Sequence, residues 1–371
     1  MVGSNARRNF LKTSCCLGGA ALFGSLVPGR SASAASLDVP VVDKLAIKVL
    51  VDSSFDIFLR PTQVHGVAFA PSRPQGDYRR SLHNEWGLSL WLESQRGSEM
   101  RSFMLDYGYT PEVLANNMEL LGVDPARLDA LIISHGHFDH FGGLMGFLDR
   151  YRDKLPADMK LYAGGEDNFC HRVARTATPG QFTDFGTLDR RELAARRITT
   201  VLAETPAVIG GHAFTTGRIQ RNSIEKVLPQ TLVEFGMKDG LGCDSSHYLP
   251  AEMAGKIVPD EHIHEHATCY HVKDRGLVVI SSCGHVGIVN TVRQAQAVSG
   301  VEKVHAIVGG FHLGPAPQDY LVQVVAEIRK LQPDVVIPMH CSGLNFVQEA
   351  RAQMPGNLLL STTGGRITFG A

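Results

Sequence analysis

The feature that most limits the fold of this chain is a dense run of metal-binding side chains directly after a short apolar segment. Residues 128–134 are predicted to form a buried strand, and four candidate metal ligands follow within six residues: His135, His137, Asp139 and His140. Two imidazoles two positions apart point to the same side of an extended loop, but they cannot share one face of a helix. Asp139 then falls at the start of the next helix, where the helix dipole favours a carboxylate. The run therefore predicts a strand, a loop and a helix that offer two ligands to each of two metal ions.

Apolar periodicity places this run in a chain of alternating strands and helices. Strands are predicted at residues 45–51, 88–93, 100–106, 128–134, 160–163, 276–282, 304–308 and 334–339, helices at 110–121, 142–152, 288–299, 319–331 and 344–354, and a hairpin at 358–369. Residues 164–261 show no clear pattern and are expected to form an extended loop insertion over the site. A chain with mostly strands early and strand–helix alternation late requires layers of both kinds of element.

Two more histidines stand at equivalent places, the carboxyl ends of later strands. His285 follows the strand at 276–282, and His340 follows the strand at 334–339. We assign His135, His137 and His285 to one metal ion, and Asp139, His140 and His340 to the other. Two divalent ions are expected, with zinc as the first expectation and iron or manganese as alternatives, because protein ligands alone discriminate poorly between divalent metals.

Cys283, two residues before His285, is a further candidate ligand, since a thiolate binds zinc at about 2.3 Å. The alternatives are a small buried residue or a disulfide with Cys341, which neighbours His340. Residues 35–371 contain five cysteines, Cys170, Cys243, Cys269, Cys283 and Cys341. An odd number leaves at least one unpaired unless chains are cross-linked, and no disulfide framework is implied.

The His-x-His-x-Asp-His run resembles the signature of the metallo-β-lactamase superfamily. Asp106, at the end of the strand predicted at 100–106, resembles the superfamily's first motif. The resemblance implies an α+β fold, a four-layer αββα sandwich with the metals at one edge between the two sheets. It also implies that Asp106 supports the metal loop by hydrogen bonds rather than binding metal itself.

The resemblance narrows to one branch of that superfamily on four segments: Glu-Trp-Gly-Leu-Ser (85–89), Cys-Gly-His-Val-Gly-Ile-Val-Asn (283–290), Gly-Gly-Phe-His-Leu (309–313) and His-Cys-Ser-Gly (340–343). This branch is usually labelled 7,8-dihydropterin-6-yl-methyl-4-(β-D-ribofuranosyl)aminobenzene 5′-phosphate synthase. Trp86 departs from the histidine that the branch tends to have there. The substrate contact implied at that position is therefore not carried over.

Other polar side chains give weaker predictions. His312 is expected near the substrate, as a proton donor or phosphate contact, or alternatively in a structural role. His262, His264, His266 and His271 alternate like one face of a strand. They are expected to form an exposed segment or the rim of the site rather than to bind metal. The amino end of the helix predicted at 288–299 could hold an anionic group such as phosphate.

Taken together, these residues predict a metal-dependent hydrolase. A metal-activated water would attack an anionic small molecule with a phosphate or ester group, with Asp139 and His312 as catalytic residues. The alternatives are a di-iron oxidoreductase on the same fold, a transferase like the synthase branch, or a binding protein with structural metals.

The first 34 residues differ in composition from the rest of the chain. Arg7 and Arg8 precede an apolar stretch at about 13–27 and small residues at 32–34, an order typical of a twin-arginine export signal. The apolar stretch is shorter than the ~20 residues of a spanning helix, so no stable membrane insertion is expected after cleavage. We expect the twin-arginine export machinery as a partner and a periplasmic or secreted protein over residues 35–371. The 36 basic and 37 acidic residues of the chain nearly balance, which does not indicate a nucleic-acid partner.

Overall fold

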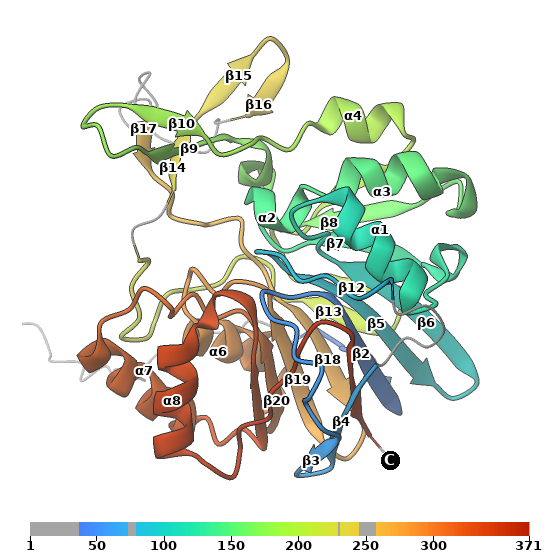
Figure 1. The fold of residues 1–371 in the computed structure, drawn as a ribbon, viewed down its shortest axis with the longest axis vertical. Coiled ribbons are helices and arrows are strands. Elements are labelled where there is room, and N and C mark those ends of the chain that lie inside the picture. The colour runs from blue at the N-terminus through green and yellow to red at the C-terminus, as the bar shows by residue number, and fades with distance from the viewer. Residues whose placement is uncertain (1–36, 73–78, 229–230, 245–256, 371) are drawn as a thin grey trace, which may run out of the picture. The chain divides into compact units, whose positions relative to one another are not determined.

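The computed structural model describes residues 37–72, 79–228, 231–244 and 257–370. The export signal predicted over residues 1–34 lies outside this described part. Within the unit Ser36–Ala371, two large sheets face each other (Figure 1).

The first large sheet contains nine strands and includes the strand that precedes the histidine run. Its order is β11 (Thr199–Leu202), β8 (Lys160–Ala163), β7 (Ala130–Ile133), β6 (Glu99–Leu105), β5 (Ser89–Arg96), β2 (Lys44–Val51), β22 (Gly365–Phe369), β4 (Val67–Pro71) and β3 (Thr62–Val64). Strands β6, β7 and β8 run parallel, so their carboxyl ends meet at one edge of the sheet.

The second large sheet contains seven strands and includes the strands that precede His285 and His340. Its order is β12 (Val208–Ile209), β13 (Ala213–Thr215), β18 (Thr268–Val272), β19 (Gly276–Ser281), β20 (Val304–Gly309) and β21 (Val335–Pro338), and β1 (Val41–Val42) joins β18. Strands β19, β20 and β21 are parallel neighbours. The loops that follow them therefore lie side by side.

Helices cover the outer face of each sheet. On the nine-stranded sheet lie α1 (Pro111–Leu120), α3 (Leu144–Tyr151) and α4 (Arg190–Ala195), and on the seven-stranded sheet lie α6 (Ile288–Ser299), α7 (Gln318–Lys330) and α8 (Leu344–Gln353). Four short 3-10 helices connect the elements: η1 (Pro125–Arg127), η2 (Arg152–Lys154), η3 (Glu166–Phe169) and η4 (His340–Ser342). The order helix, sheet, sheet, helix confirms the predicted four-layer sandwich. Among the described residues, none of the helices has the length and apolar character that crossing a membrane would require.

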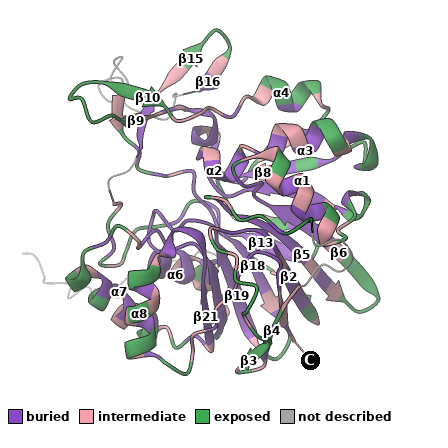
Figure 2. Ribbon diagram, in the orientation of Figure 1, coloured by how far each residue is buried: buried purple, intermediate pink, exposed green. Residues whose placement is uncertain are grey.

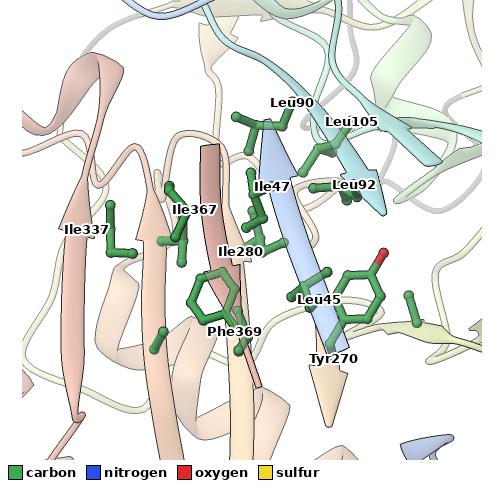
Figure 3. Packing of buried hydrophobic residues seen from close by; sticks show 14 of the residues in the cluster. Leu45, Ile47, Leu90, Leu92, Leu105, Tyr270, Ile280, Ile337, Ile367 and Phe369 are labelled. Carbon is green, nitrogen blue, oxygen red and sulfur yellow. The ribbon is translucent and has the colours of Figure 1, made fainter. Parts of the chain in front are cut away.

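The main core lies between the two sheets, where buried residues are continuous (Figure 2). Ile47 and Leu90 of the first sheet and Ile280 and Ile337 of the second belong to this core (Figure 3). Burying such a side chain stabilises the fold by about 1.5–3 kcal/mol. The two sheets are thus held together by apolar contacts, and the polar ligands gather at one edge of this core.

The short apolar run before the histidines is explained by burial on both faces of β7. Ala130 and Ile132 face the core between the sheets, whereas Leu131 and Ile133 face the cluster under the outer helices. The sequence of a strand that is buried on both faces is a continuous run of apolar residues, rather than an alternation of apolar and polar residues. The metal loop is therefore anchored on a rigid, central strand.

Most predicted elements agree with the structure within a few residues, but the hairpin predicted at 358–369 is wrong. Leu358 forms a parallel bridge with Val336 of β21 in the seven-stranded sheet. Strand β22 instead pairs with β2 and β4 in the nine-stranded sheet. The segment crosses from one sheet to the other because Ile367 and Phe369 are buried between them.

The stretch expected as an extended loop insertion at 164–261 contains regular structure. Strands β10 (Phe182–Asp184), β9 (His171–Arg175), β14 (Leu232–Glu234) and β17 (Ile257–Pro259) form a small antiparallel sheet, and β15 (Gly236–Lys238) pairs with β16 (Leu241–Cys243). A disulfide joins Cys170 to Cys243. These strands are only three to five residues long. They are too short to give a periodic signal in the sequence.

Candidate metal centre

The carboxyl ends of strands from both sheets bring the predicted site residues to one edge of the sandwich. β7 leads into the loop at 134–137 and then α2 (Phe138–Phe141), while β19, β20 and β21 lead into the loops that carry residues 283–285, His312 and His340. Every predicted site side chain has an exposed fraction of 9% or less: His135, His137, Asp139, His140, Cys283, His285, His312 and His340. Residues more than 200 positions apart thus form one buried cluster.

Ligand atoms within this cluster fall into two neighbouring groups. His140, Cys283 and His340 lie within 4.8 Å of one another, and Asp139 Oδ2 lies 3.3 Å from His340 Nε2. The three residues that we assigned to one metal ion therefore lie together, with Cys283 beside them. In the other group, which we call the first group because it contains His135 and His137, His135 lies with Cys283 and His285, and His137 lies with His285 and a residue that we had not assigned, His262.

The expectation that residues 262–271 form an exposed segment or the rim of the site is wrong for three of the four histidines. His262, His264 and His266 are almost fully buried. His262 lies in a turn before β18 and stacks on His285, with ring centroids 4.0 Å apart. Only His271 belongs to the strand, where it is half-buried. His262 is thus a candidate ligand that the sequence interpretation missed. The sequence feature that could have drawn attention to His262 is the acidic residue two positions earlier, Asp260.

Unpaired imidazole nitrogens show that this cluster fits a metal ion. Among the described residues, His135 Nε2, His140 Nε2 and His340 Nε2 are buried without a hydrogen-bond partner, and so are both ring nitrogens of His262 and His285. A buried polar atom without a partner is unfavourable by about 1–3 kcal/mol. Several imidazole nitrogens with free lone pairs therefore lie close together. Zinc, which binds nitrogen and sulfur ligands, accepts such a set.

Burial also keeps four of the imidazoles in the form that binds metal, whereas the neighbouring Cys341 and Asp139 outweigh burial and raise the pKa of His340 to about 10, and Asp139 and Asp106 raise that of His140. Burial lowers the pKa of His135, His137 and His285 well below the usual histidine value, and nearby histidines lower it further. For His262, burial lowers the pKa to about 4 although Asp260 opposes the change. A neutral imidazole presents a free lone pair at neutral pH, so these side chains are ready for coordination without losing a proton.

Asp106 supports the metal loop through three hydrogen bonds. Its Oδ1 accepts from the backbone N–H of Ser134 (2.8 Å), and its Oδ2 accepts from Ser134 Oγ (2.7 Å) and His140 Nδ1 (2.7 Å). Because the Ser134 hydroxyl donates to Asp106, its oxygen accepts from His135 Nδ1, 2.9 Å away. The Nε2 atoms of His135 and His140 are therefore the free ones, and both are unpaired.

Other residues orient the remaining rings. His137 Nε2 lies 2.9 Å from Thr231 Oγ1, which leaves Nδ1 as its coordinating nitrogen. His340 is held at two points, because its backbone N–H donates to Asp52 Oδ1 (2.7 Å) and its Nδ1 lies 3.0 Å from Ser53 Oγ. His340 also has a positive φ of 47°, a strained conformation that only surrounding contacts can maintain. Nothing in the sequence marked Asp52, Ser53 or Thr231 as part of the site.

A buried ion pair lies behind the first group. Arg172 Nε donates to Asp260 Oδ2 at 2.7 Å, and Arg172 Nη2 lies 3.1 Å from His264 Nε2. A Cβ atom at position 136 would lie 2.3 Å from Arg172 Nη1, so only glycine fits between the two histidines of the loop. Arg172 and Asp260 thus fix the position of the loop and of the turn that carries His262.

Two buried glutamates hold the loop after β19. Glu265 accepts hydrogen bonds from the backbone N–H groups of His285 (3.1 Å) and Val286 (2.8 Å), and burial raises its pKa to about 7. Glu225 Oε2 accepts from Val289 N (3.0 Å) and Asn290 N (3.1 Å) in the first turn of α6. The anion site expected at the amino end of this helix is therefore already filled by a carboxylate of the chain itself.

The disulfide considered between Cys283 and Cys341 is not formed. Both are free, as is Cys269, with 3.1 Å between the Cys283 and Cys341 sulfur atoms. His312 lies against this pair: its Nδ1 is 3.7 Å from Cys283 Sγ, and its backbone N–H donates to Cys341 Sγ. Its ring also contacts His285, at 4.2 Å between centroids. His312 thus borders the first group, at the wall of a small cavity that Lys226 and Tyr320 also line.

Comparisons with known proteins agree with this architecture. The model of the metallo-beta-lactamase superfamily matches residues 95–185, which include the histidine run. A relative in Methanocaldococcus jannaschii, the 7,8-dihydropterin-6-methyl-4-(beta-D-ribofuranosyl)-aminobenzene-5'-phosphate synthase, is 28% identical over 275 residues, covering 72% of this chain and 84% of that protein. An uncharacterized protein of the same organism is 24% identical over 248 residues, covering 66% of this chain and 80% of its own length. The crystal structure of Tm1679, a metal-dependent hydrolase of the beta-lactamase superfamily, covers 87% of this chain and 98% of that one, with a TM-score of 0.62 and 20% identity.

Proposed function

We propose that this chain, which has the metallo-β-lactamase fold, is a metal-dependent hydrolase that cleaves an ester bond in a small molecule. The observation that carries the proposal is the set of buried, unpaired imidazole nitrogens on His135, His140, His262, His285 and His340. A protein does not gain stability from such a set unless something binds to it. These five histidines come from four segments of the chain, which follow β7, precede β18, follow β19 and follow β21, and they meet at one edge of the two sheets. A metal ion held there could act on a bound substrate.

The residues suit two divalent ions, with zinc as the expected metal. His135, His137, His262 and His285 would hold one ion, and Asp139, His140, His340 and Cys283 the other. When bound, such ions polarise a substrate oxygen and lower the pKa of water from 15.7 to about 7. Burial raises the pKa of Asp139, but His140 and His340 outweigh it and hold the pKa below the usual carboxyl value. Asp139 is therefore ionised and able to orient the attacking water through a hydrogen bond.

His312 is suited to the leaving group. Its imidazole lies beside His285 and faces the cavity that it shares with Lys226 and Tyr320. A histidine in that position can donate a proton to the oxygen or sulfur that departs. Its positive φ of 47° indicates that the loop after β20 is held in place to present this ring.

The carboxylate of Glu225 at the amino end of α6 favours uncharged esters over phosphoesters. A helix amino end would otherwise attract a phosphate, but here it already carries a negative side chain. A second anion next to Glu225 would be repelled. Lactones, thioesters and carboxylic esters are therefore the substrates that the site supports best.

The test combines metal content with a substrate panel. Protein purified without chelator is expected to contain about two divalent ions per chain and to hydrolyse at least one ester of the panel, which also includes phosphoesters. His137→Ala should lose turnover and metal, whereas His271→Ala, a half-buried histidine outside the cluster, should retain both. Full activity of His137→Ala would overturn the proposal.

One alternative has a specific observation behind it. The synthase relative is 28% identical over 72% of this chain, and its name describes bond formation rather than hydrolysis. A transferase would need an acceptor other than water, so product analysis in the presence and absence of an amine or aromatic acceptor separates the two functions. An absorption spectrum of the purified protein separates both from a di-iron oxidoreductase, because iron bound by a thiolate is coloured and zinc is not.

A further inference from the structure

A half-exposed tryptophan lies against one of the metal-centre histidines. The indole of Trp86 is 54% exposed, and its ring centroid is 4.7 Å from that of His340. The other tryptophan of the chain, Trp91, is 1% exposed and packs in the core under the outer helices. A large apolar ring that serves only packing is expected to be buried as Trp91 is. Other large apolar side chains, such as Phe58, are exposed too, and what distinguishes Trp86 from them is its contact with a histidine of the metal centre.

The loop that carries this indole is fixed on both sides. Glu85 Oε1 accepts hydrogen bonds from the backbone N–H groups of Tyr109 (2.8 Å) and Thr110 (2.9 Å). Asn84 Nδ2 donates to the backbone oxygen of Ser53, whose own hydroxyl lies 3.0 Å from His340 Nδ1. The indole is thus presented by a pinned loop and not by a freely moving one.

The same loop touches the metal-binding loop directly. Gly87 has a φ of +139°, and a Cβ atom there would lie 2.4 Å from the backbone oxygen of Asp139. Only glycine permits this approach. The loop that presents the indole to His340 therefore packs directly on the backbone of Asp139, and both residues belong to the group of His140, Cys283 and His340.

A second exposed aromatic residue stands on the adjacent loop. Tyr109 is 44% exposed, and its ring contacts Phe138 of α2 edge-on, with centroids 5.1 Å apart. Trp86 and Tyr109 are linked through Glu85. Two exposed aromatic side chains on pinned loops thus lie next to the loop that carries Asp139, a surface suited to a flat, uncharged group.

We infer that Trp86 is a specificity-determining residue and that a planar aromatic ring of the substrate stacks on its exposed face. The inference rests on the proposed ester hydrolysis and adds the substrate class: aryl or arylcarboxylic esters. The strength of stacking on an indole depends on the area of flat contact between the two rings. A flat ring is therefore favoured over a puckered ring of similar size and charge.

Binding measured without turnover tests this inference. The metal-loaded protein is titrated with 4-nitrobenzoate, which quenches tryptophan fluorescence, and the bound ligand is then displaced by benzoate or by cyclohexanecarboxylate. Both competitors carry one carboxylate on a six-membered carbon ring, but only benzoate is flat. Because Trp91 is buried, the quenched signal comes from Trp86.

Benzoate is expected to bind about threefold to tenfold more tightly than cyclohexanecarboxylate. By calorimetry, Trp86→Ala should bind 4-nitrobenzoate roughly tenfold more weakly and lose the preference for the flat ring, while Trp86→Phe should keep both within about threefold. Val322→Ala, an exposed residue on α7, is the control and should change neither. Metal content and the near-ultraviolet circular dichroism of each variant verify that it is folded and loaded.

Equal affinity for the two competitors, or an unchanged preference in Trp86→Ala, would overturn the inference. Binding of a quaternary ammonium ion that depends on Trp86, without any benzoate preference, would overturn it too, because it would assign the indole to a cation. Ring-selective binding without ester turnover would contradict the proposed hydrolysis but not this inference. Ester turnover without ring selectivity would contradict this inference but not the proposed hydrolysis.

Discussion

The rings of His262 and His285 lie face to face, with centroids 4.0 Å apart and planes 11° from parallel. The contact joins the turn before β18 to the loop after β19, and it brings together four ring nitrogens that have no hydrogen-bond partner among the described residues. Two imidazoles can stack this closely only when at least one is uncharged, and burial lowers the pKa of both. The pair adds a fourth candidate ligand, His262, to the three histidines that the sequence interpretation assigned to one metal ion.

His262→Ala is expected to lower the metal content of the purified protein by up to one ion per chain, because it removes a ligand from the first position. The matched control is His271→Ala, nine residues later, whose ring is half-buried in β18 and outside the cluster. Metal analysis after dialysis without chelator measures both. Equal metal content in the two variants would remove His262 from the ligand set.

Asp106→Asn is expected to weaken metal binding by about 10–100-fold, because the amide has one acceptor oxygen and cannot accept both from the backbone N–H of Ser134, at Oδ1, and from His140 Nδ1, at Oδ2. Asp334→Asn is the matched control: Asp334 also accepts from a histidine, His305 Nδ1 at 2.8 Å, but away from the centre. Competition with a chromophoric chelator gives both affinities. If the two substitutions weakened binding equally, Asp106 would have no special role.

In the metal-free protein, the contribution of His262 to stability should be lost as the pH falls below about 7. Burial lowers the pKa of His262 to about 4, so the unfolded chain, with a histidine pKa near 6.5, binds the proton first. The stabilising effect of the neutral ring is present above the unfolded pKa and is lost as the pH decreases. Between pH 7.5 and 5.5, His262 alone should reduce the free energy of unfolding by about 1.4 kcal/mol.

Urea unfolding of chelator-treated protein at the two pH values measures this loss. His135, His137 and His285 act in the same direction, since their pKa values are lowered as well. His340 and Glu265 act in the opposite direction, since their pKa values are raised to about 10 and about 7, so the contribution of His262 is read from a variant that lacks it. In His262→Asn the loss between pH 7.5 and 5.5 should be about 1 kcal/mol smaller than in the original chain. Identical losses in both proteins would show that His262 is not buried and neutral.

Removal of the disulfide between Cys170 and Cys243 is expected to lower the free energy of unfolding by about 2–4 kcal/mol, because the bond closes a long loop of the unfolded chain. The double variant with Cys170→Ser and Cys243→Ser, unfolded in urea, gives this value. In the unreduced, denatured original chain, an alkylating reagent should label Cys269, Cys283 and Cys341 but neither member of the disulfide. Labelling of Cys170 there would contradict the assignment.

Replacing Arg7 and Arg8 by lysine is expected to leave the protein in the cytoplasm as a precursor, because the twin-arginine machinery requires the arginine pair. Cell fractionation and the mass of the protein measure this outcome. The original chain should be recovered from the periplasm or the medium, shortened near residue 34. Unchanged export of the lysine variant would point to another route.

The sequence by itself determined the elements whose signal is local. The apolar run of β7, followed by four ligands within six residues, located the metal loop, and α6 begins and ends at the predicted residues 288 and 299. His285 and His340 could be predicted because each follows a recognisable strand. The layer order then followed from the alternation of these elements and from the resemblance to a known fold.

Only the tertiary structure decided which distant residues complete the site. His262 was expected in an exposed segment or at the rim of the site, yet the packing of β18 against β19 places it on His285. The role of Glu225 as a helix cap could not be predicted, because this residue lies more than 60 residues before α6 in the sequence. Trp86 stood out in the sequence only as a departure from the branch motif, and the tertiary structure places its ring against His340. Ligation, capping and stacking depend on distances of a few ångströms between segments, and local patterns carry no information about which segments will meet.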